Sequence, residues 1–163
     1  MNVSQLTIIS GGQTGVDRGA LDAAMALGAP CGGWCPQGRH AEDGPIRDNY
    51  PLIELKGGGY RDRTLKNIED SDATLVLRFN VCSPGTELTV KHALNCGKPL
   101  LVIEPLITSI ECAQEQVAQF CLSRGVRSLN VAGPRASEES TGYEFALRLV
   151  LALIRLRCSG DHV

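Results

Sequence analysis

An apolar run, a glycine-rich turn and the start of a helix follow one another within residues 8–22, and this order limits the fold more than any other feature. Glycines stand at positions 11, 12 and 15, and an apolar stripe at helical spacing begins at Val16. A helix that starts directly after a glycine turn offers unpaired backbone N–H groups and the positive end of its dipole to an anion. The spacing matches neither the GxGxxG fingerprint of dinucleotide-binding folds nor the GxxxxGK(S/T) sequence of P-loops. The segment predicts a cradle for a phosphate-bearing ligand, with an ordinary strand-to-helix turn as the alternative.

The rest of the chain repeats this alternation of short apolar strands and amphipathic helices. The apolar runs predict strands at residues 5–10, 30–34, 51–55, 73–79, 99–104 and 128–131. Stripes at helical spacing predict helices at residues 16–27, 62–70, 86–96, 109–123 and 140–156. Because such alternation produces βαβ units, we expect an α/β fold with a mostly parallel central sheet flanked by helices. The length of 163 residues predicts one domain, residues 1–163.

Composition narrows the classes of partner. A formal net charge of −2 provides no basic field for nucleic acid, and an aromatic content of 4% is low for base stacking. No apolar stretch reaches membrane-spanning length, and no secretory signal is visible. We therefore expect a cytoplasmic protein that binds neither nucleic acid nor membrane.

The seven cysteines are odd in number and include no CxxC pair. In a reducing cytosol we expect free thiols, most of them buried as small apolar side chains. No second Cys/His pair stands at zinc spacing, so no structural metal is expected. Cys35, between Trp34 and Pro36 in a predicted loop, is the cysteine of most interest. The cysteines are residues 31, 35, 82, 96, 112, 121 and 158.

Three further loops follow predicted strands, and the carboxyl ends of parallel strands are where α/β sheets bind ligands. Residues 35–49 lack a regular pattern, which is typical either of a functional loop or of a solvated one. Residues 83–89 repeat the order of strand, glycine turn and helix, and residues 132–137 follow the last strand. Together with nearby arginines, these loops predict a basic, backbone-rich pocket for a compact anionic molecule. The arginines are Arg18, Arg39, Arg61 and Arg135.

Several sequence blocks, in order along residues 6–135, resemble the molybdenum cofactor carrier proteins. The blocks are Ser10–Asp22, Gly33–Arg39, Ala41–Ile46, Arg63–Thr64 with Asn67, Ser71–Thr74, Ser83–Glu87 and Asn130–Arg135. The Pro-Gly-Thr-Glu sequence at 84–87 is also similar to a shortened PGGxGTxxE motif of the lysine-decarboxylase-like nucleotide-binding superfamily. The resemblance implies a Rossmann-like three-layer sandwich that binds its ligand at the carboxyl ends of the strands.

The resemblance also implies a binding protein that carries the molybdenum cofactor, a pterin with a terminal phosphate and a dithiolene-bound metal. The phosphate is expected either on the glycine loop at residues 11–15 or on the Gly85–Thr86 turn. Arginines would supply charge, and Trp34 would stack on the planar ring. The expected ligand-binding residues are Gly11, Gly12, Gln13, Thr14, Gly15, Asp17, Arg18, Trp34, Arg39, Ser83, Gly85, Thr86, Glu87, Gly133 and Arg135.

The expected partners are an anionic small molecule and, as recipient of the cofactor, a molybdoenzyme or a cofactor-synthesis protein. The wide apolar stripe of the last predicted helix favours a homo-oligomer.

Two other functions are open at this point. Some members of the wider superfamily hydrolyse N-glycosidic bonds in nucleotides with the Glu of this motif and an Arg, which would make Glu87 catalytic here. Against this, Ser83–Gly85 departs from the doubled glycine of the motif, and no Ser-His-Asp or Cys-His arrangement is evident. The third hypothesis is a sensor that binds a nucleotide such as NAD or ADP-ribose and signals through a partner.

Overall fold

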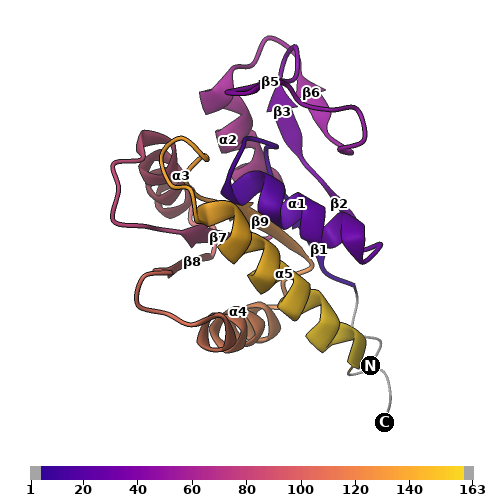
Figure 1. Cartoon of the computed structure of the whole chain (residues 1–163), viewed down its shortest axis with the longest axis vertical. Coiled ribbons are helices and arrows are strands. Elements are labelled where there is room, and N and C mark those ends of the chain that lie inside the picture. Colours follow the sequence, from indigo (N-terminus) through magenta and orange to yellow (C-terminus); the bar gives the residue numbers. More distant parts are fainter. Residues whose placement is uncertain (1–4, 160–163) are drawn as a thin grey trace.

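A five-stranded parallel sheet forms the centre of the molecule (Figure 1). The computed structural model describes the backbone of residues 5–159 and the side chains of residues 5–156. The strands lie in the order β2-β1-β9-β7-β8, and each neighbouring pair is parallel. They are β1 (Thr7–Ile9), β2 (Cys31–Gly32), β7 (Ala73–Leu77), β8 (Leu100–Ile103) and β9 (Ser128–Ala132). With helices on both faces, this arrangement confirms the expected Rossmann-like α/β sandwich.

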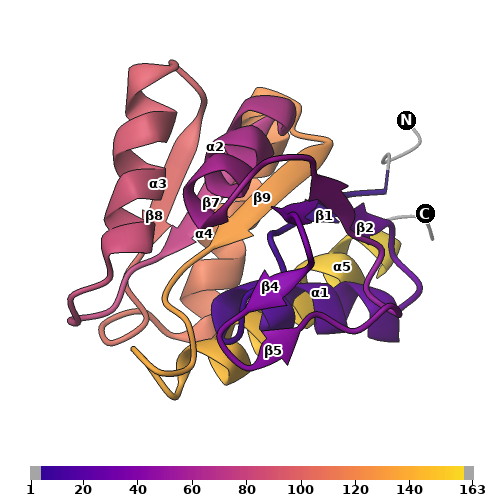
Figure 2. The same ribbon diagram turned by 90° about the horizontal axis from the view of Figure 1, so that it is seen from above.

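Five helices cover the two faces of the sheet. They are α1 (Val16–Ala26), α2 (Tyr60–Asp70), α3 (Pro84–Asn95), α4 (Ile110–Arg124) and α5 (Gly142–Ser159). Figure 2 shows α2 and α3 on one face and α1, α4 and α5 on the other. Across the strand order of the sheet, the connections from β2 to β7 and from β7 to β8 move in one direction. The connections from β1 to β2 and from β8 to β9 move in the opposite direction. Because parallel crossovers are right-handed, the direction of each step decides which face its helix covers.

The core forms between the sheet and its two helical layers. All five residues of β7 and three of the five in β9 are buried, as expected for strands covered on both faces. Helices α1 and α5 lie in close contact, because a Cβ at Gly19 would lie only 2.4 Å from the carbonyl oxygen of Tyr143. The hydroxyl groups of Tyr50 and Tyr143 both donate to Asp22, at 2.7 and 2.6 Å. These contacts fix α5 and the segment before β6 to α1.

The segment between β2 and α2 folds outside the central sheet. β3 (Trp34–Pro36) pairs in parallel with β6 (Ile53–Leu55), and β4 (His40–Ala41) forms an antiparallel hairpin with β5 (Gly44–Pro45). The predicted strand 30–34 is divided at Gly33, because its φ of +140° interrupts the extended chain and a Cβ there would lie 2.1 Å from Ser10 O. The predicted strand 51–55 therefore pairs with β3, and residues 35–49 contain the hairpin.

The start of α1 and the end of α2 lie where predicted, and the other helix ends differ from the predicted ones by one to three residues. The start of α3 moves to Pro84, because proline is suited to the first helical turn, where its missing N–H group is not needed. Within residues 5–159 no helix is both long and apolar enough to cross a membrane.

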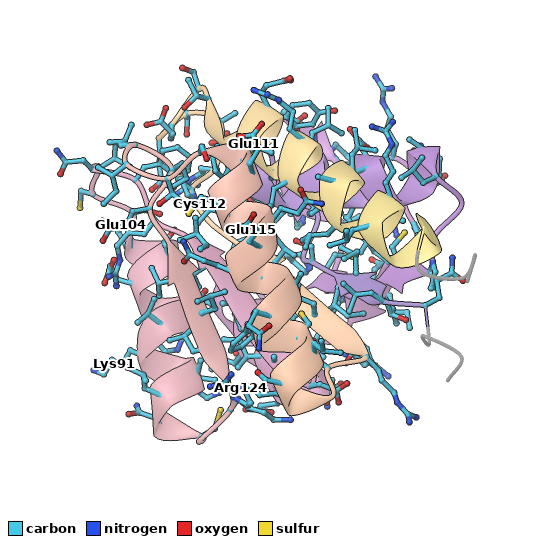
Figure 3. All side chains as sticks on the ribbon, turned by 90° about the horizontal axis from the view of Figure 1, so that it is seen from below. Lys91, Glu104, Glu111, Cys112, Glu115 and Arg124 are labelled. Atoms are coloured by element: carbon cyan, nitrogen blue, oxygen red, sulfur yellow. The ribbon has the colours of Figure 1, made fainter. Side chains whose placement is uncertain are left out.

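The prediction that most cysteines are buried is wrong for those that the structure describes. Cys112, for example, lies on the outward side of α4 beside Glu111 and Glu115 (Figure 3). Among the others, Cys35 and Cys121 are buried, Cys31 is half-buried, and Cys82 and Cys96 are exposed. Cys158 lies outside the described side chains.

Candidate functional site

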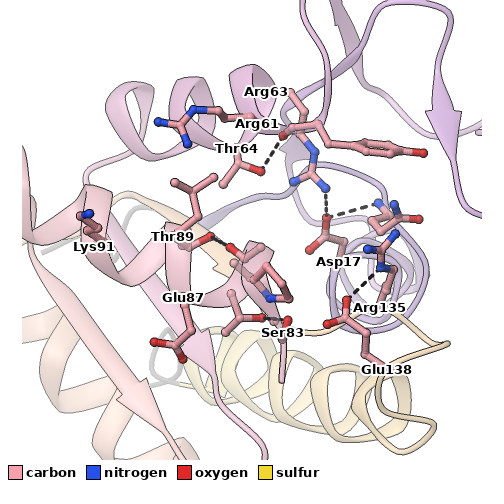
Figure 4. A pocket seen from close by; sticks show the side chains of 18 residues that line it. Asp17, Arg61, Arg63, Thr64, Ser83, Glu87, Thr89, Lys91, Arg135 and Glu138 are labelled. Atoms are coloured by element: carbon pink, nitrogen blue, oxygen red, sulfur yellow. Dashed lines mark hydrogen bonds and ion pairs between the residues drawn. The ribbon is translucent and has the colours of Figure 1, made fainter. Parts of the chain in front are cut away.

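A cavity of about 490 Å³, called the pocket below, opens at the carboxyl ends of β1, β7 and β9 (Figure 4). It lies where the chain leaves the sheet in opposite directions, from β9 to α5 on one face and from β7 to α3 on the other. Open α/β sheets bind ligands at such a switch point. The lining residues are Gln13, Asp17, Tyr60, Arg61, Arg63, Thr64, Ser83–Thr89, Lys91, Ala132, Gly133, Arg135 and Glu138.

The start of α3 forms one wall of the pocket. Ser83 occupies the N-cap position, and its hydroxyl accepts from no backbone N–H group of the helix but bonds to the hydroxyl of Thr86 at 2.6 Å. Glu87 N donates to Ser83 O, and the N–H groups of Gly85 and Thr86 precede this bond. A Cβ on Gly85 would meet no atom within 4 Å, and the φ of this glycine is not left-handed. Neither packing nor backbone conformation therefore requires a glycine at position 85.

A buried ion pair between Asp17 of α1 and Arg63 of α2 forms a second wall. Arg63 Nη2 lies 3.3 Å from Asp17 Oδ2, and the two side chains are 13% and 5% exposed. The guanidinium fills the place of a side chain at position 11, since a Cβ on Gly11 would lie 2.2 Å from Arg63 Nη1. Burial raises the pKa of the Asp17 carboxyl, while Arg63 and the N–H group of Gln13 act in the opposite direction. Arg63 is thus held by the charge of Asp17 and by the space over Gly11.

Three backbone N–H groups at the glycine loop before α1 donate within the protein. Gln13 N donates to Asp17, Thr14 N to the side chain of Gln13, and Val16 N to the carbonyl of Pro134. Gly15 has a φ of +81°, and a Cβ there would lie 2.5 Å from Pro134 O. Of residues 11–15, only Gln13 lines the pocket. The loop glycines are therefore explained by backbone conformation and packing.

Glu42, in the hairpin of β4 and β5, joins the glycine loop to the loop after β9. Its carboxylate accepts from the hydroxyl of Thr14 and from both the N–H and the hydroxyl of Ser137. Its own N–H donates to Gln13 Oε1 at 2.9 Å. Burial alone would raise the pKa of Glu42, but the bonds from Ser137 and Thr14 and the charge of Arg135 hold it below its usual value. The hairpin thus fixes the wall that carries Gln13 and Arg135.

Arg135 and Glu138 form the wall after β9. Arg135 Nε donates to Glu138 Oε1 at 2.9 Å and lies 3.8 Å from Glu42 Oε2. The pocket lining as a whole carries four cationic and three acidic side chains: Arg61, Arg63, Lys91 and Arg135, against Asp17, Glu87 and Glu138. This excess of positive charge adds to the helix dipole at the start of α3 and suits an anionic group.

The structure brings about half of the predicted ligand-binding residues into the pocket. Those in its lining are Gln13, Asp17, Ser83, Gly85, Thr86, Glu87, Gly133 and Arg135. Those outside the lining are Gly11, Gly12, Thr14, Gly15, Arg18, Trp34 and Arg39.

Two of the predicted arginines bind protein groups instead of the pocket. Arg18 donates from Nε to Gly12 O and from both Nη atoms to the carboxylate of Asp43. The guanidinium of Arg39 donates to four carbonyl oxygens, those of Ile46, Arg47, Tyr50 and Leu52. Each guanidinium therefore orders part of the segment between β2 and α2, which contains the two small sheets.

Trp34 and Cys35 also have contacts within the protein. Trp34 Nε1 donates to Asp70 at 2.8 Å, and Lys66 Nζ lies 5.6 Å from the centre of its ring. Cys35 is fully buried in a small apolar cluster with Leu21, Ala41, Ile46 and Leu52, and burial raises the pKa of its thiol. Within the described side chains, no group of three His, Cys, Asp or Glu residues could hold a metal ion.

Sequence reasoning missed Tyr60, Lys91 and Glu138, which all line the pocket. Tyr60 follows the three glycines at 57–59, so a second glycine turn before a helix was the available signal. Lys91 lies two turns into α3, and only the position of α2 opposite α3 brings it to the site. Glu138 was detectable only as an acid three residues after Arg135.

Comparison with known proteins places the chain in a family. The model of cpYpsA, the circularly permutated YpsA SLOG family, matches residues 8–154. The chain belongs to the cpYpsA family. Its fold is similar to the crystal structure of the "Putative molybdenum carrier protein" from Syntrophus aciditrophicus SB, with a TM-score of 0.88. The two sequences are 39% identical, over 92% of this chain and 95% of the other, which confirms the resemblance to molybdenum carriers. A search of curated proteins found no match.

The permutation of the cpYpsA family is visible in the strand order. Counted from β9, the strands follow as β9, β1, β2, β7 and β8, and the sheet order becomes 3-2-1-4-5. This is the order of the doubly wound fold, in which the ligand binds beside the first strand. The pocket of this cpYpsA protein lies beside β9, because its lining includes the loops that follow β9 and its neighbours β1 and β7.

Proposed function

We propose that this protein binds and carries a small molecule with a terminal phosphate, which binds at the start of α3. The observation that carries the proposal is Gly85, whose backbone borders the pocket although no protein atom or backbone angle requires a glycine there. The absence of a side chain lets phosphate oxygens approach the N–H groups of Gly85 and Thr86. The hydroxyls of Ser83 and Thr86 supply further donors on the same wall.

The hydrogen bonding of the backbone N–H groups favours the start of α3 over the glycine loop as the phosphate site. The N–H groups of Gln13, Thr14 and Val16 already donate to protein acceptors, and a phosphate there would have to displace them. The N–H groups at the start of α3 precede the first helical bond and belong to the pocket wall.

The charges around the pocket support an anionic ligand. Arg135 uses Nε on Glu138, and both of its Nη groups are outside that bond. Arg61 and Lys91 lie in the lining on the α2 and α3 sides. A phosphate at the start of α3 would therefore be surrounded by cations on both sides.

We propose that the phosphate belongs to the molybdenum cofactor. The "Putative molybdenum carrier protein" of S. aciditrophicus has the same fold and 39% sequence identity. A pocket of about 490 Å³ is within the range of about 300–1,000 Å³ that small-molecule sites occupy. In such a carrier, this chain's residues bind the phosphate and the ring, while the metal is cargo for a recipient molybdoenzyme or cofactor-synthesis protein.

The test is retention of the cofactor by protein purified anaerobically from cells that make it. Parent protein, Gly85→Val and the control Cys112→Val are compared by native mass spectrometry and molybdenum analysis. Cys112 lies exposed on the first turn of α4, outside the pocket lining, so it matches Gly85 in being an open position near a helix start. We expect a molybdenum-bearing pterin on the parent and the control and its loss from Gly85→Val, with melting temperatures within about 3 °C.

Other outcomes contradict the proposal in distinct ways. Retention by Gly85→Val would exclude the start of α3 as the phosphate site. A bound nucleotide without molybdenum, or cleavage of an added nucleoside monophosphate, would instead support the nucleotide chemistry of the wider superfamily. Glu87, which lines the pocket and pairs with Arg78 at 3.1 Å, would then be tested as Glu87→Gln.

A further inference from the structure

Strand β8 forms an outer edge of the central sheet, and no described strand pairs with its free side. The strand at the other edge, β2, has two residues, whereas β8 has four. On the inner side of β8, the carbonyl oxygens of Pro99 and Ile103 accept from N–H groups of β7 and of the residue that follows it, both at 2.9 Å. Because successive residues of a parallel strand direct their backbone groups to alternate sides, the N–H and C=O groups of Leu100 and Val102 point to the open edge.

The edge at β8 lacks the features that usually prevent contact with another strand. Folded proteins protect open edges with charges, prolines or bulges, because unpaired backbone groups attract other chains. Pro99 gives no protection here, since its backbone faces β7 and its missing N–H group is not needed at the open side. The four residues of β8 are all apolar. The edge is therefore free to pair with a further strand.

We propose that β8 pairs in antiparallel orientation with β8 of a second copy of this chain, about a two-fold axis at Leu101. In this register, Leu100 of one copy exchanges both backbone hydrogen bonds with Val102 of the other. Both residues direct their backbone groups to the open edge, as the register requires. A two-fold interface also requires a surface that is complementary to itself, and the residues around β8 meet that condition.

The charges at the two ends of β8 favour this register. Lys98 and Glu104 stand three residues before and three residues after Leu101, so the axis places each of them opposite the other in the second copy. Opposite residues of an antiparallel pair share one face of the sheet, where unlike charges attract. Lys98 Nζ donates to Ser71 O at 2.9 Å and has two further N–H groups. Glu104 is exposed at the margin of the molecule (Figure 3).

The exposed apolar side chains beside β8 are complementary in the same way. Leu106 and Ile107, in the loop after β8, are 64% and 81% exposed, and Leu94, near the end of α3, is 65% exposed. Since α3 precedes β8 and the loop follows it, the two apolar groups lie at opposite ends of the strand. The two-fold axis therefore brings the loop of one copy to the end of α3 in the other, where both bury apolar surface.

The test is the oligomeric state of the full chain over a concentration series, measured by sedimentation velocity. The parent should form a dimer. Val102→Pro removes an N–H group that points to the open edge, so the variant should keep its circular dichroism spectrum and become a monomer. Glu104→Lys should weaken the dimer by about ten-fold or more, because two attractive pairs become repulsive.

Two further variants serve as controls. The double variant Lys98→Glu with Glu104→Lys restores unlike charges in the proposed register and should recover the dimer. Glu144→Lys makes the same charge change on α5, which packs against α1 and away from β8, and should behave as the parent.

Three results would overturn the proposal. A monomeric parent would leave the edge of β8 to an extended segment of another protein. A dimer that persists in both Val102→Pro and Glu104→Lys would place the interface elsewhere. If Val102→Pro does not fold, the charge variants carry the test, and a double variant that dimerises no better than Glu104→Lys would reject the register.

Discussion

The starts of α1 and α3 look alike in sequence and differ in structure. Each follows a strand of the same sheet, contains glycine and points its N-terminus toward the same edge. At α1 the N–H groups of the loop donate to Asp17, Gln13 and Pro134, and a side chain at Gly15 would collide with backbone. At α3 the first N–H groups border the pocket, and Gly85 has open space above it.

This difference shows that a glycine turn before a helix is a potential anion site only until its donors are used. The dipole and the exposed N–H groups come with every helix start. What decides their use is whether protein acceptors, here the nearby Gln13 and Asp17 and the distant Pro134, take the donors first. The glycines of the loop before α1 are required by packing and backbone conformation, whereas Gly85 has open space above it and borders the pocket.

The largest effect on stability is expected from Asp17, whose carboxylate accepts from Gln13 N in the glycine loop and pairs with Arg63. Asp17→Asn removes the partner of the buried Arg63 guanidinium, and we expect a loss of about 3–5 kcal/mol in the free energy of unfolding. Urea denaturation at pH 7 measures it. The control is Asp43→Asn, because Asp43 pairs with Arg18 but its side chain is 51% exposed. This substitution should lower the free energy of unfolding by no more than about 1 kcal/mol. Similar losses in the two variants would show that Arg63 does not depend on Asp17.

A smaller but clear loss is expected from Gly15→Ala. The φ of +81° disfavours any side chain, and the new Cβ would lie 2.5 Å from Pro134 O. We expect the free energy of unfolding to fall by about 2–3 kcal/mol, again by urea denaturation. A variant as stable as the parent would mean that the glycine loop is not a packing feature.

The hairpin that fixes the glycine loop gives a pH-dependent effect. The pKa of Glu42 is lowered in the folded protein, so its contribution is present above the unfolded value and is lost as the pH falls below about 4.5. Glu42→Gln should cost about 1 kcal/mol at pH 7. It should also flatten the decline in stability between about pH 5 and pH 3, as followed by thermal melts. An unchanged slope would remove Glu42 from the acid response.

The smallest change in stability belongs to Gly85→Ala. Alanine favours helix, and the position is open, so the free energy of unfolding should stay within about 0.5 kcal/mol of the parent or rise slightly. Affinity for ribose 5-phosphate should nevertheless fall, because the methyl group enters the space of the phosphate. A variant that is as stable as the parent and binds ribose 5-phosphate equally well would show that the start of α3 is not the phosphate site.

The sequence predicted the features that depend on local pattern. Continuous apolar runs identified β7 and β9. The parallel topology expected from the alternation of strands and helices put the loops at residues 11–15, 83–89 and 132–137 at one edge of the sheet. The same reasoning did not reveal that β3 leaves the central sheet, because Trp34 pairs with Ile53 and its N–H donates to Asn67 of α2, 33 residues away.

The candidate site was harder to predict because arginines can donate to the protein itself. Arg18 and Arg39 stand beside the predicted loops, and for that reason carboxylate and carbonyl oxygens are within their reach. Arg63 stands far along the chain and enters the site from across the sheet edge. Sequence distance from a glycine loop was therefore a poor guide to which cations line the pocket.

The placement of Arg63 over Gly11 has an evolutionary consequence. Since the guanidinium occupies the volume of the missing side chain, the two positions form an epistatic pair: a side chain at 11 requires the flexible end of Arg63 to move away from Gly11, or a shorter residue at 63. A lineage that loses Arg63 is free to replace Gly11, whereas one that keeps Arg63 can do so only by shifting the guanidinium that pairs with Asp17. In an alignment of descendants, a non-glycine residue at position 11 would mark the branches in which this wall of the pocket had been rebuilt.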